Sequence, residues 1–318
     1  GAGGGKNMPG RPPPPVRMGA PSGPGESRKT AGSNVFQHSV DARRGAELAE
    51  LALQQHAEFR NRLIDHGVMV TCVRSLDATP DAPFCNNWFS THPPTDLGRE
   101  GTLVLYPMLA PSRRLERRPE LVSLLRQRCA RTVDLSPHEQ QHLYLESTGS
   151  LCLDPRSGVA YAAVSPRTDL GLARIWAAEL GYRLVAFEST DATGTPYYHT
   201  NVMMFLGHGL AGVCLESISE HASDGLASRD AVEASLREGG FEILPISRDQ
   251  VLAYCGNCLA LISDNDERLF AMSSTAYRGF SEIERQRISK HGTIVHAELD
   301  AFETLGGGSA RCLLGELY

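Results

Sequence analysis

A helix followed directly by a strand recurs five times along this 318-residue chain. Helical periodicity and a short apolar run alternate in each unit. The pairs are predicted at 39–65 and 68–73, 119–130 and 132–135, 170–181 and 183–187, 229–239 and 241–244, and 281–291 and 293–296. If the strands after these helices start at Val68, Arg131, Arg183, Phe241 and Thr293, successive starts are 63, 52, 58 and 52 residues apart. Five similar units favour a repeat architecture such as a propeller over a two-domain doubly wound sheet, which needs no equal units.

Further strand-like runs follow a loop within these units. They are predicted at 103–106, 159–164, 213–217 and 269–273. Each unit of about 50 residues therefore combines one helix with two or three strands. The fold class predicted is α/β, with pseudo-fivefold repetition.

The first 32 residues differ in composition from the rest of the chain. Nine Gly and seven Pro make up half of them, including the run from Pro12 to Pro15. Such a segment cannot bury enough apolar surface to offset the entropy lost on ordering. We therefore predict a disordered tail over residues 1–32 and a single catalytic domain over residues 33–318. A proline-motif ligand for a partner is the alternative interpretation of the tail.

Charge, hydropathy and cysteine usage exclude several classes of function. The net charge is −6; the first 32 residues carry +4, which leaves 26 basic and 36 acidic residues on the body. An acidic body disfavours nucleic-acid binding. No apolar run approaches the roughly 18 residues of a membrane helix. Eight Cys scattered mostly within apolar runs favour a reduced, cytoplasmic protein over a disulfide scaffold.

Polar residues at one offset in equivalent units should converge on a shared axis. Asn87, Glu146, His199, Asn257 and Cys312 lie 15 to 19 residues after the five strand starts, in segments rich in Gly, Asn, Ser or Thr. A Cys, a His and a Glu in one cavity provide a thiolate nucleophile, a proton carrier and a carboxylate that orients the carrier. Simpler interpretations are a buried thiol, a loop histidine, a solvated carboxylate and turn residues.

Four segments around these residues resemble the guanidine-modifying (pentein) or amidinotransferase superfamily. The closest resemblance is to its citrulline-utilisation hydrolase and dimethylargininase-like branch. In chain order the segments read PDAPFCNNWFSTH (80–92), LESTGS (145–150), YHTNVMM (198–204) and GGGSARC (306–312). The resemblance covers about residues 33–318. It implies a five-bladed α/β propeller with the site on its central axis.

The resemblance implies that Cys312 is the nucleophile, His199 the general acid/base and Glu146 the acidic partner that orients His199. In the implied mechanism Cys312 attacks as a thiolate whose pKa is held low by the charged form of His199. His199 then protonates the departing amine and activates the water that hydrolyses the covalent thio-intermediate. Neither a metal nor an organic cofactor is needed.

The resemblance also implies the residues that bind the substrate. Asp81, Phe84 and Asn87 fall in the segment that contacts the planar head group, and Asn201 falls where related enzymes often have a second carboxylate. Asn87 and Asn201 are amides at positions where a guanidinium, which only donates, would need acids. An amide also donates to a carbonyl oxygen, so we predict a neutral ureido head group, with citrulline converted to ornithine.

Arg167 has the chemistry to bind the substrate's α-carboxylate. The four arginines between 113 and 118 offer the same chemistry, although a solvated helix start is the simpler interpretation. The pair Cys255 and Cys258 resembles half of a zinc or redox site, but two core thiols flanking a turn fit better without a second pair. The eleven His form no metal-ligand cluster.

Two departures from the family pattern accompany these matches. Ser147 stands where the family commonly has Gly, which affects how Glu146 is presented. Family members also begin with a strand before the segment Asn34–Gln37, whereas here only Val16–Met18 suggests one. Without that strand the first blade would lack a partner for its β-ladder.

Several functions compete with a citrulline hydrolase. An arginine or dimethylarginine deiminase-type hydrolase and an amidinotransferase are the enzymatic alternatives, because pocket shape and water access select the acceptor. A binding propeller is the non-enzymatic alternative, and it predicts no intact set of Cys312, His199 and Glu146. The partner expected is a small amino-acid substrate, without nucleic acid or membrane, and a homodimer is compatible with the sequence.

Overall fold

The computed structural model describes residues 16–20, 42–94 and 100–318. Within these ranges fifteen strands form five separate three-stranded sheets, in the orders β15-β1-β2, β3-β4-β5, β6-β7-β8, β11-β10-β9 and β12-β13-β14. The strands are β1 (Val16–Ala20), β2 (Val70–Arg74), β3 (Phe89–His92), β4 (Thr102–Leu105), β5 (Arg131–Asp134), β6 (Cys152–Asp154), β7 (Val159–Ala163), β8 (Arg183–Phe187), β9 (Met204–Gly207), β10 (Leu210–Val213), β11 (Glu242–Pro245), β12 (Leu259–Ile262), β13 (Arg268–Ser273), β14 (Thr293–Ala297) and β15 (Leu314–Glu316). The predicted α/β class is confirmed, and five small sheets exclude the two-domain doubly wound arrangement.

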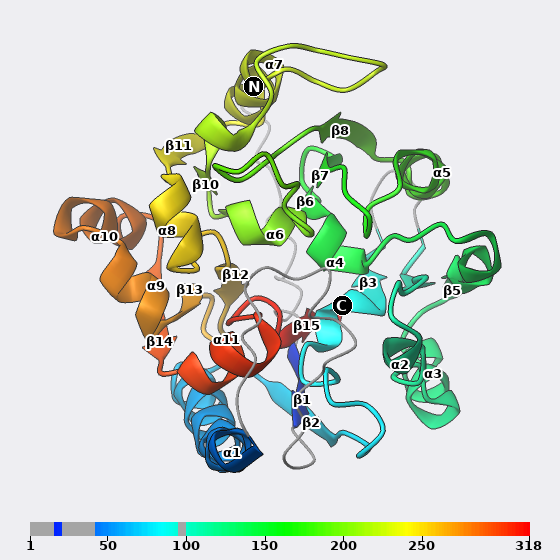
Figure 1. Ribbon diagram of the computed structural model, residues 1–318, viewed down its shortest axis with the longest axis vertical. Coiled ribbons are helices and arrows are strands. Elements are labelled where there is room, and N and C mark those ends of the chain that lie inside the picture. The colour runs from blue at the N-terminus through cyan, green and yellow to red at the C-terminus, as the bar shows by residue number, and fades with distance from the viewer. Residues whose placement is uncertain (1–15, 21–41, 95–99) are drawn as a thin grey trace, which may run out of the picture.

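The helices fall into a long peripheral set and a short central set. Figure 1 shows α1, α3, α5, α7 and α10 on the periphery and α4, α6 and α11 near the centre. The α-helices are α1 (Ala42–Asp65), α2 (Pro111–Arg114), α3 (Pro119–Arg126), α4 (Ser147–Ser150), α5 (Leu170–Leu180), α6 (Thr200–Met203), α7 (Arg229–Glu238), α8 (Arg248–Leu252), α9 (Ser274–Gly279), α10 (Glu282–Ser289) and α11 (Asp300–Gly306). Short 3₁₀ turns are η2 (Cys85–Asn87), η3 (Ser136–Gln141) and η4 (Leu215–Ser217).

All five sheets share one strand pattern. The middle strand runs antiparallel to one neighbour and parallel to the other, as where β4 pairs with β3 and β5. The same holds in the remaining sheets. Parallel neighbours need a crossover connection, and each long peripheral helix supplies one. The five predicted helix-then-strand units are therefore confirmed, whereas the strand predicted at 213–217 is wrong, because β10 ends at Val213 and η4 follows.

Local sequence explains the crossover helices, and α5 is an example. The Asp169 carboxylate caps its first turn by accepting from the Leu172 amide at 2.7 Å. Gly181 ends it at φ 69°, a left-handed conformation that glycine adopts without steric cost. Between these ends the helix buries Leu172, Trp176 and Leu180 against the sheet below it.

Strand β1 corrects the prediction for the N-terminal segment. Residues 16–20 pair in parallel with β2 and antiparallel with β15, where Met18 lies opposite Leu314. Val16 and Met18 are fully buried. The disordered tail predicted over residues 1–32 is thus wrong for these five residues, and the first sheet has its upstream strand. The other residues of that segment lie outside the described ranges.

Five strands, one from each sheet, surround the centre of the molecule. Strands β3, β6, β9, β12 and β15 all contribute to the lining of one cavity of about 330 Å³. Figure 1 shows the five sheets arranged around this centre, with α4, α6 and α11 beside it. Loops that join the sheets therefore meet on the same axis, where the predicted site residues lie.

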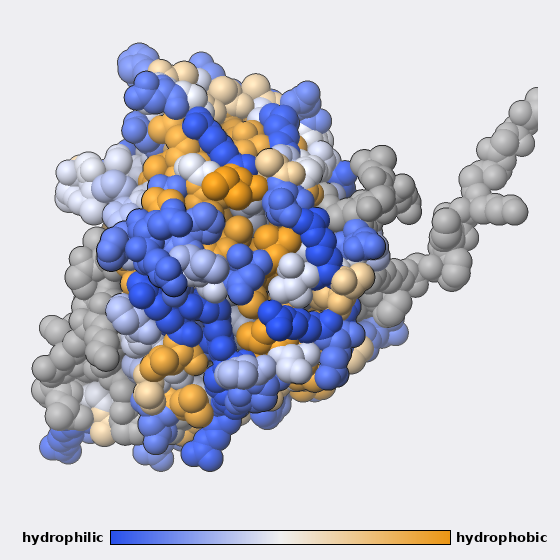
Figure 2. Space-filling view, turned by 90° about the vertical axis from the view of Figure 1, so that its right-hand side faces the viewer, coloured by the Kyte–Doolittle hydropathy of each residue, from blue (hydrophilic) through white to orange (hydrophobic). Residues whose placement is uncertain are grey.

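The outer surface carries no single large apolar patch on the face turned toward the viewer in Figure 2, where polar side chains separate the apolar ones. Exposed apolar residues such as Leu124 and Ile175 lie on separate helices. Such scattered residues are normal for a protein surface, and the homodimer stays a prediction. In the described part of the chain, no helix combines the length and the apolarity that crossing a bilayer requires.

Candidate active site

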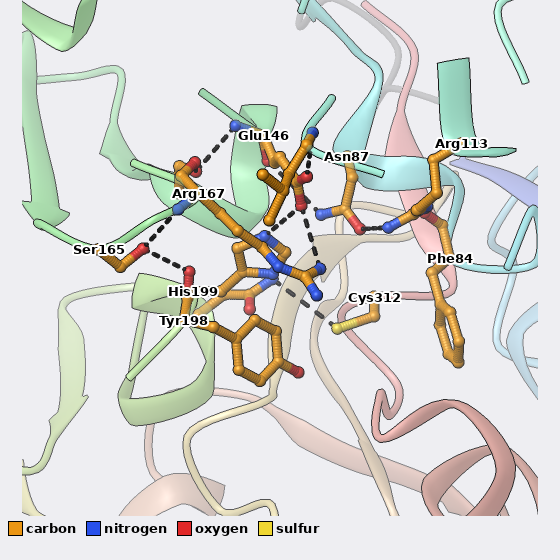
Figure 3. Close-up of polar contacts among 12 residues, drawn as sticks. Phe84, Asn87, Arg113, Glu146, Ser165, Arg167, Tyr198, His199 and Cys312 are labelled. Carbon is orange, nitrogen blue, oxygen red and sulfur yellow. Dashed lines mark hydrogen bonds and ion pairs between the residues drawn. The ribbon is translucent and has the colours of Figure 1, made fainter. Parts of the chain in front are cut away.

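A pocket of about 20 Å³ lies where loops from several sheets meet on the axis. Its lining consists of Asp81, Phe84, Asn87, Arg113, Arg167, Tyr198, His199, Gly306, Gly308 and Cys312. Six of the eight predicted site residues are among them. Figure 3 shows the side chains of Asn87, Arg167, His199 and Cys312 converging from separate elements. The structure thus brings the predicted nucleophile and the predicted proton carrier into one cavity.

Glu146 lies directly behind His199 and fixes the imidazole. Its Oε2 is 2.8 Å from His199 Nε2, while its Oε1 accepts from the Leu109 amide at 3.0 Å. Glu146 and His199 precede the short helices α4 and α6, which pack together, and both side chains are buried. With Nε2 engaged by Glu146, Nδ1 is the remaining ring nitrogen, and it lies beside Gly149.

Two arginines, Arg167 and Arg113, shift the pKa values of Glu146 and His199. Burial alone would raise the pKa of Glu146, but Arg167, whose Nη1 lies 3.4 Å from Oε2, together with His199 and Arg113, lowers it far below its usual range. Burial lowers the pKa of His199 to about 4; Glu146 opposes this change, while Arg167 and Arg113 add to it. At neutral pH the resting site therefore holds a carboxylate beside a neutral imidazole.

Cys312 follows α11 in a turn in which its amide donates to Ser309 O at 3.0 Å. The side chain is 4% exposed. Asn257 Nδ2 donates to Sγ at 3.3 Å, and Asn201 Nδ2 approaches Sγ at 3.9 Å. Burial nevertheless raises the pKa of the thiol above its usual value. In the ligand-free protein burial thus favours a neutral thiol on Cys312 and a neutral imidazole on His199, so the thiolate with a lowered pKa stays a prediction for the attacking state.

Asn201 lies elsewhere than the prediction placed it. It belongs to the lining of the 330 Å³ central cavity and not to the lining of the pocket with His199. Its Oδ1 is buried without a hydrogen-bond partner, while its Nδ2 faces the sulfur of Cys312. Asn201 therefore contacts the sulfur of Cys312 from outside the lining of that pocket, and its contact with the substrate head group stays a prediction.

Tight packing around α4 positions Glu146 and Asn87. Ser147 adopts φ 47° and donates through Oγ to Phe89 O at 2.7 Å. A side chain at Gly149 would overlap Asn87 Nδ2 and lie 2.8 Å from the His199 ring. Ser147 thus adopts a left-handed backbone conformation at a modest cost in free energy, and Glu146 still contacts His199.

Arg113 lines the pocket, although the sequence favoured a solvated helix start over a binding role for it. It is 3% exposed, so the predicted solvated helix start is wrong at this position. Its Nε donates to Glu116 at 2.8 Å, its Nη1 to Asn87 Oδ1 at 2.7 Å and its Nη2 to Phe84 O at 2.7 Å. Burial raises the pKa of Glu116 to about 7, against the opposing effect of Arg113. In the sequence, this ion pair is indicated by Glu116, an acidic residue three positions after Arg113.

Arg167 lies across the pocket on the face of an aromatic ring. Its guanidinium sits 5.1 Å from the centroid of the Tyr198 ring, in a cation–π contact. The Tyr198 hydroxyl donates to Gly307 O at 2.9 Å, which fixes the ring against the loop before Cys312. Arg167 is therefore held in a defined orientation at the pocket wall.

The thiols Cys255 and Cys258 are buried in the core, and each donates to a backbone carbonyl. All eight cysteines are free. In the described ranges, no group of three or more His, Cys, Asp or Glu side chains is placed to hold a metal ion.

Thiol labelling tests the resting state of Cys312. Because burial raises the pKa of this thiol, we expect iodoacetamide to modify it slowly at pH 7 and faster as the pH rises above 9. The exposed Cys72 should react before it at neutral pH. Peptide mass spectrometry after timed labelling measures both rates. Fastest labelling of Cys312 at pH 7 would restore the thiolate–imidazolium pair.

Acid unfolding tests the resting state of His199. The unfolded histidine titrates near pH 6.5, and the folded pKa is about 4. The folded state thus binds fewer protons between these values, so stability is complete above pH 6.5 and is lost toward pH 4, by about 3 kcal/mol. Urea unfolding at pH 7 and pH 4.5 should show a shallower pH dependence for His199→Asn than for the native protein. The exposed His221 gives the control His221→Asn, which should keep the native slope; equal slopes for all three proteins would contradict the neutral imidazole.

Comparison with known proteins gives one family and a set of similar folds. The family model of eukaryotic N,N dimethylarginine dimethylhydrolase matches residues 21–318, which confirms the resemblance predicted from the motifs. No curated protein matches the sequence.

Among solved structures, apo ArgZ, an arginine dihydrolase from the ornithine-ammonia cycle in cyanobacteria, has 15% identity and a TM-score of 0.69, covering 96% of this chain and 40% of that chain. A variant of AgrE bound to L-arginine has 16% identity and a TM-score of 0.73, and the match covers 96% of this chain and 40% of that chain. An S-methyl-L-thiocitrulline adduct of a dimethylarginine dimethylaminohydrolase variant has 14% identity and a TM-score of 0.63, and the match covers 95% of this chain and 98% of that chain. This chain thus spans less than half of the first two, and at these identities the likeness concerns the fold.

Proposed function

Because this chain belongs to the eukaryotic N,N dimethylarginine dimethylhydrolase family, we propose that it hydrolyses a C–N bond of a linear urea or amidine through a covalent intermediate on Cys312. The preferred substrate in this proposal is a ureido amino acid, with citrulline converted to ornithine. The observation that carries the proposal is the shared pocket of Cys312 and His199, with Glu146 fixed 2.8 Å behind the imidazole.

The first half of the reaction forms the intermediate. As Sγ of Cys312 attacks the ureido carbon, its proton passes to the Nδ1 of neutral His199. The bond from that carbon to the substrate's δ-nitrogen breaks, and His199 returns the proton to the departing amine. Ornithine leaves, and a carbamoyl group remains on the sulfur. Asn257 and Asn201, which face Sγ, stabilise the developing thiolate.

The second half consumes one water. His199 takes a proton from the water while its oxygen attacks the carbamoyl carbon, the C–S bond breaks, and the proton returns to the sulfur. The carbamic acid released divides into ammonia and carbon dioxide. Glu146 stays ionised throughout and stabilises the imidazolium that forms in each half. Citrulline and water thus give ornithine, ammonia and carbon dioxide.

The composition of the pocket wall supports a ureido head group. Asp81 is the carboxylate in the lining, whereas Glu116 and Glu146 lie behind it, each engaged by an arginine. Asn87 provides an amide, and Arg113 and Arg167 provide only donors. A ureido group has a carbonyl acceptor for such donors and N–H groups for Asp81, whereas a guanidinium has donors alone. Arg167, held on Tyr198, is proposed to bind the α-carboxylate.

The remaining proposals concern architecture and setting. Five sheets with one strand pattern, whose strands share a central cavity, support a five-bladed α/β propeller. Eight free thiols support a reducing, cytoplasmic compartment.

A substrate panel tests the proposal. The purified chain is incubated with citrulline, arginine and N,N-dimethylarginine, and ornithine, citrulline and ammonia are measured. Ornithine and ammonia in equal amounts from citrulline are expected. Citrulline formed from dimethylarginine, with none consumed, would favour the second candidate, the dimethylarginine hydrolase that the family match indicates. No turnover of any of the three would contradict a hydrolase of this kind.

A further inference from the structure

We propose that Arg113 determines substrate selectivity by fixing the Asn87 amide, so that its NH₂ group faces the pocket and donates to the carbonyl oxygen of a ureido head group. Arg113 is thus a positioning residue, and Asn87 is the group that recognises the substrate. This inference rests on the proposed hydrolase function and names the feature that separates a neutral urea from a guanidinium.

The orientation of Asn87 follows from the chemistry of its neighbour. Arg113 Nη1 lies 2.7 Å from the terminal atom Oδ1 of Asn87. A guanidinium carries five N–H donors and no acceptor. The Asn87 atom at this distance must therefore be the oxygen, since the flipped amide would place two donors against each other. Arg113 thereby excludes one of the two amide orientations.

Arg113 itself cannot turn away from Asn87 without losing several contacts. Glu116 holds one edge of its guanidinium through two hydrogen bonds, with Nε to Oε1 at 2.8 Å and Nη2 to Oε2 at 3.1 Å. Nη2 also donates to Phe84 O at 2.7 Å. The side chains of Arg113 and Glu116 are 4% and 1% exposed, so water cannot replace these partners. Because these contacts fix the planar guanidinium of Arg113, its Nη1 is a fixed hydrogen-bond donor to Asn87 Oδ1.

The nitrogen of Asn87 points away from Arg113. Nδ2 lies against Gly149, close to the His199 ring, and donates to Glu146 O at a long 3.5 Å. That carbonyl occupies one of its two hydrogens, and the second remains for a ligand in the pocket that Asn87 lines. A ureido oxygen would accept it. The N–H groups of a guanidinium would meet a donor, and leaving buried donors without acceptors weakens binding strongly.

Binding to an inactive protein tests the donor without depending on catalysis. In the Cys312→Ala background, calorimetry compares citrulline with arginine before and after Asn87→Asp. The carboxylate can still accept from Arg113 but cannot donate to the pocket. We expect the ratio of citrulline to arginine affinity to fall by about 10- to 100-fold. A change of less than threefold would overturn the role of Asn87.

Two variants test the role of Arg113. Arg113→Lys keeps a cation for Glu116, but an ammonium cannot hold Glu116 and Asn87 in a fixed fork; we expect citrulline selectivity to fall although Asn87 is unchanged. Arg117→Met is the matched control, because Arg117 pairs with Glu139 and does not line the pocket. Native selectivity in Arg113→Lys, or an equal loss in Arg117→Met, would overturn the positioning role.

The failure of this inference and the failure of the proposed function give different results. If the native chain releases ornithine and Asn87→Asp leaves the affinity ratio unchanged, the selectivity device is wrong and the hydrolase stands. If the native chain turns over no substrate and binds neither amino acid, the proposed function is wrong.

Discussion

Replacing Cys312 by serine should lower turnover by at least about 10⁴-fold, because a serine hydroxyl beside a neutral imidazole is a far weaker nucleophile toward a urea than the thiol. Stability should change by less than about 1 kcal/mol, since serine matches the shape of cysteine in this turn. Ornithine release measures turnover, and urea unfolding measures stability. The native protein quenched during turnover should carry one carbamoyl group on the peptide that contains Cys312.

Cys214→Ala provides the control for this experiment. Cys214 is a fully buried thiol that does not line the pocket. Its variant should keep native turnover, although it loses a core sulfur. Comparable activity of Cys312→Ser and the native chain, or a carbamoyl group on another cysteine, would remove Cys312 from the reaction.

Replacing Glu146 by glutamine should affect both folding and rate. The variant leaves Arg167 buried without its carboxylate, and such a loss costs about 3 kcal/mol of unfolding free energy. It also removes the charge that stabilises the His199 imidazolium, so kcat should fall by about 10³-fold. Denaturant unfolding and initial rates of ornithine release measure the two effects.

Glu139→Gln separates a general loss of stability from a specific loss of rate. Glu139 pairs with Arg117 outside the pocket lining. Its variant should lose stability and keep kcat within about threefold. If both variants lose kcat equally, Glu146 acts only through the stability of the fold.

Much of the fold could be predicted because it repeats. Each helix-then-strand unit carries its own signals, such as Asp169 before α5 and Gly181 after it, so five separate interpretations supported one another. Strand β1 carries no such signal. Its flanks are rich in Gly and Pro, and pairing with β2 and β15 gives Val16–Ala20 its structure, which a local pattern cannot report.

The site residues likewise divide into those that the sequence could predict and those that it could not. Cys312, His199 and Glu146 could be singled out because the motifs around them resemble those of a known superfamily, and their offsets within the repeated units agreed with a shared site. Arg113 could not, because its burial depends on Asn87 and Phe84 from another segment, while its neighbours in sequence are charged and suggest solvent. The motif position of Asn201 was recognised, but the motif could not show that its side chain contacts the sulfur of Cys312 and lines the central cavity.

The antiparallel pairing of β15 with β1 has a kinetic consequence. Val16 lies opposite Glu316, and Cys312 stands just before β15, in a turn that Arg311 ties to Glu316 at 3.0 Å. Contacts between such distant residues form slowly during folding, because the intervening loop must close first. We therefore expect the turn of Cys312 to reach its native position only after β1 and β15 pair, so that partly folded chains lack the assembled site.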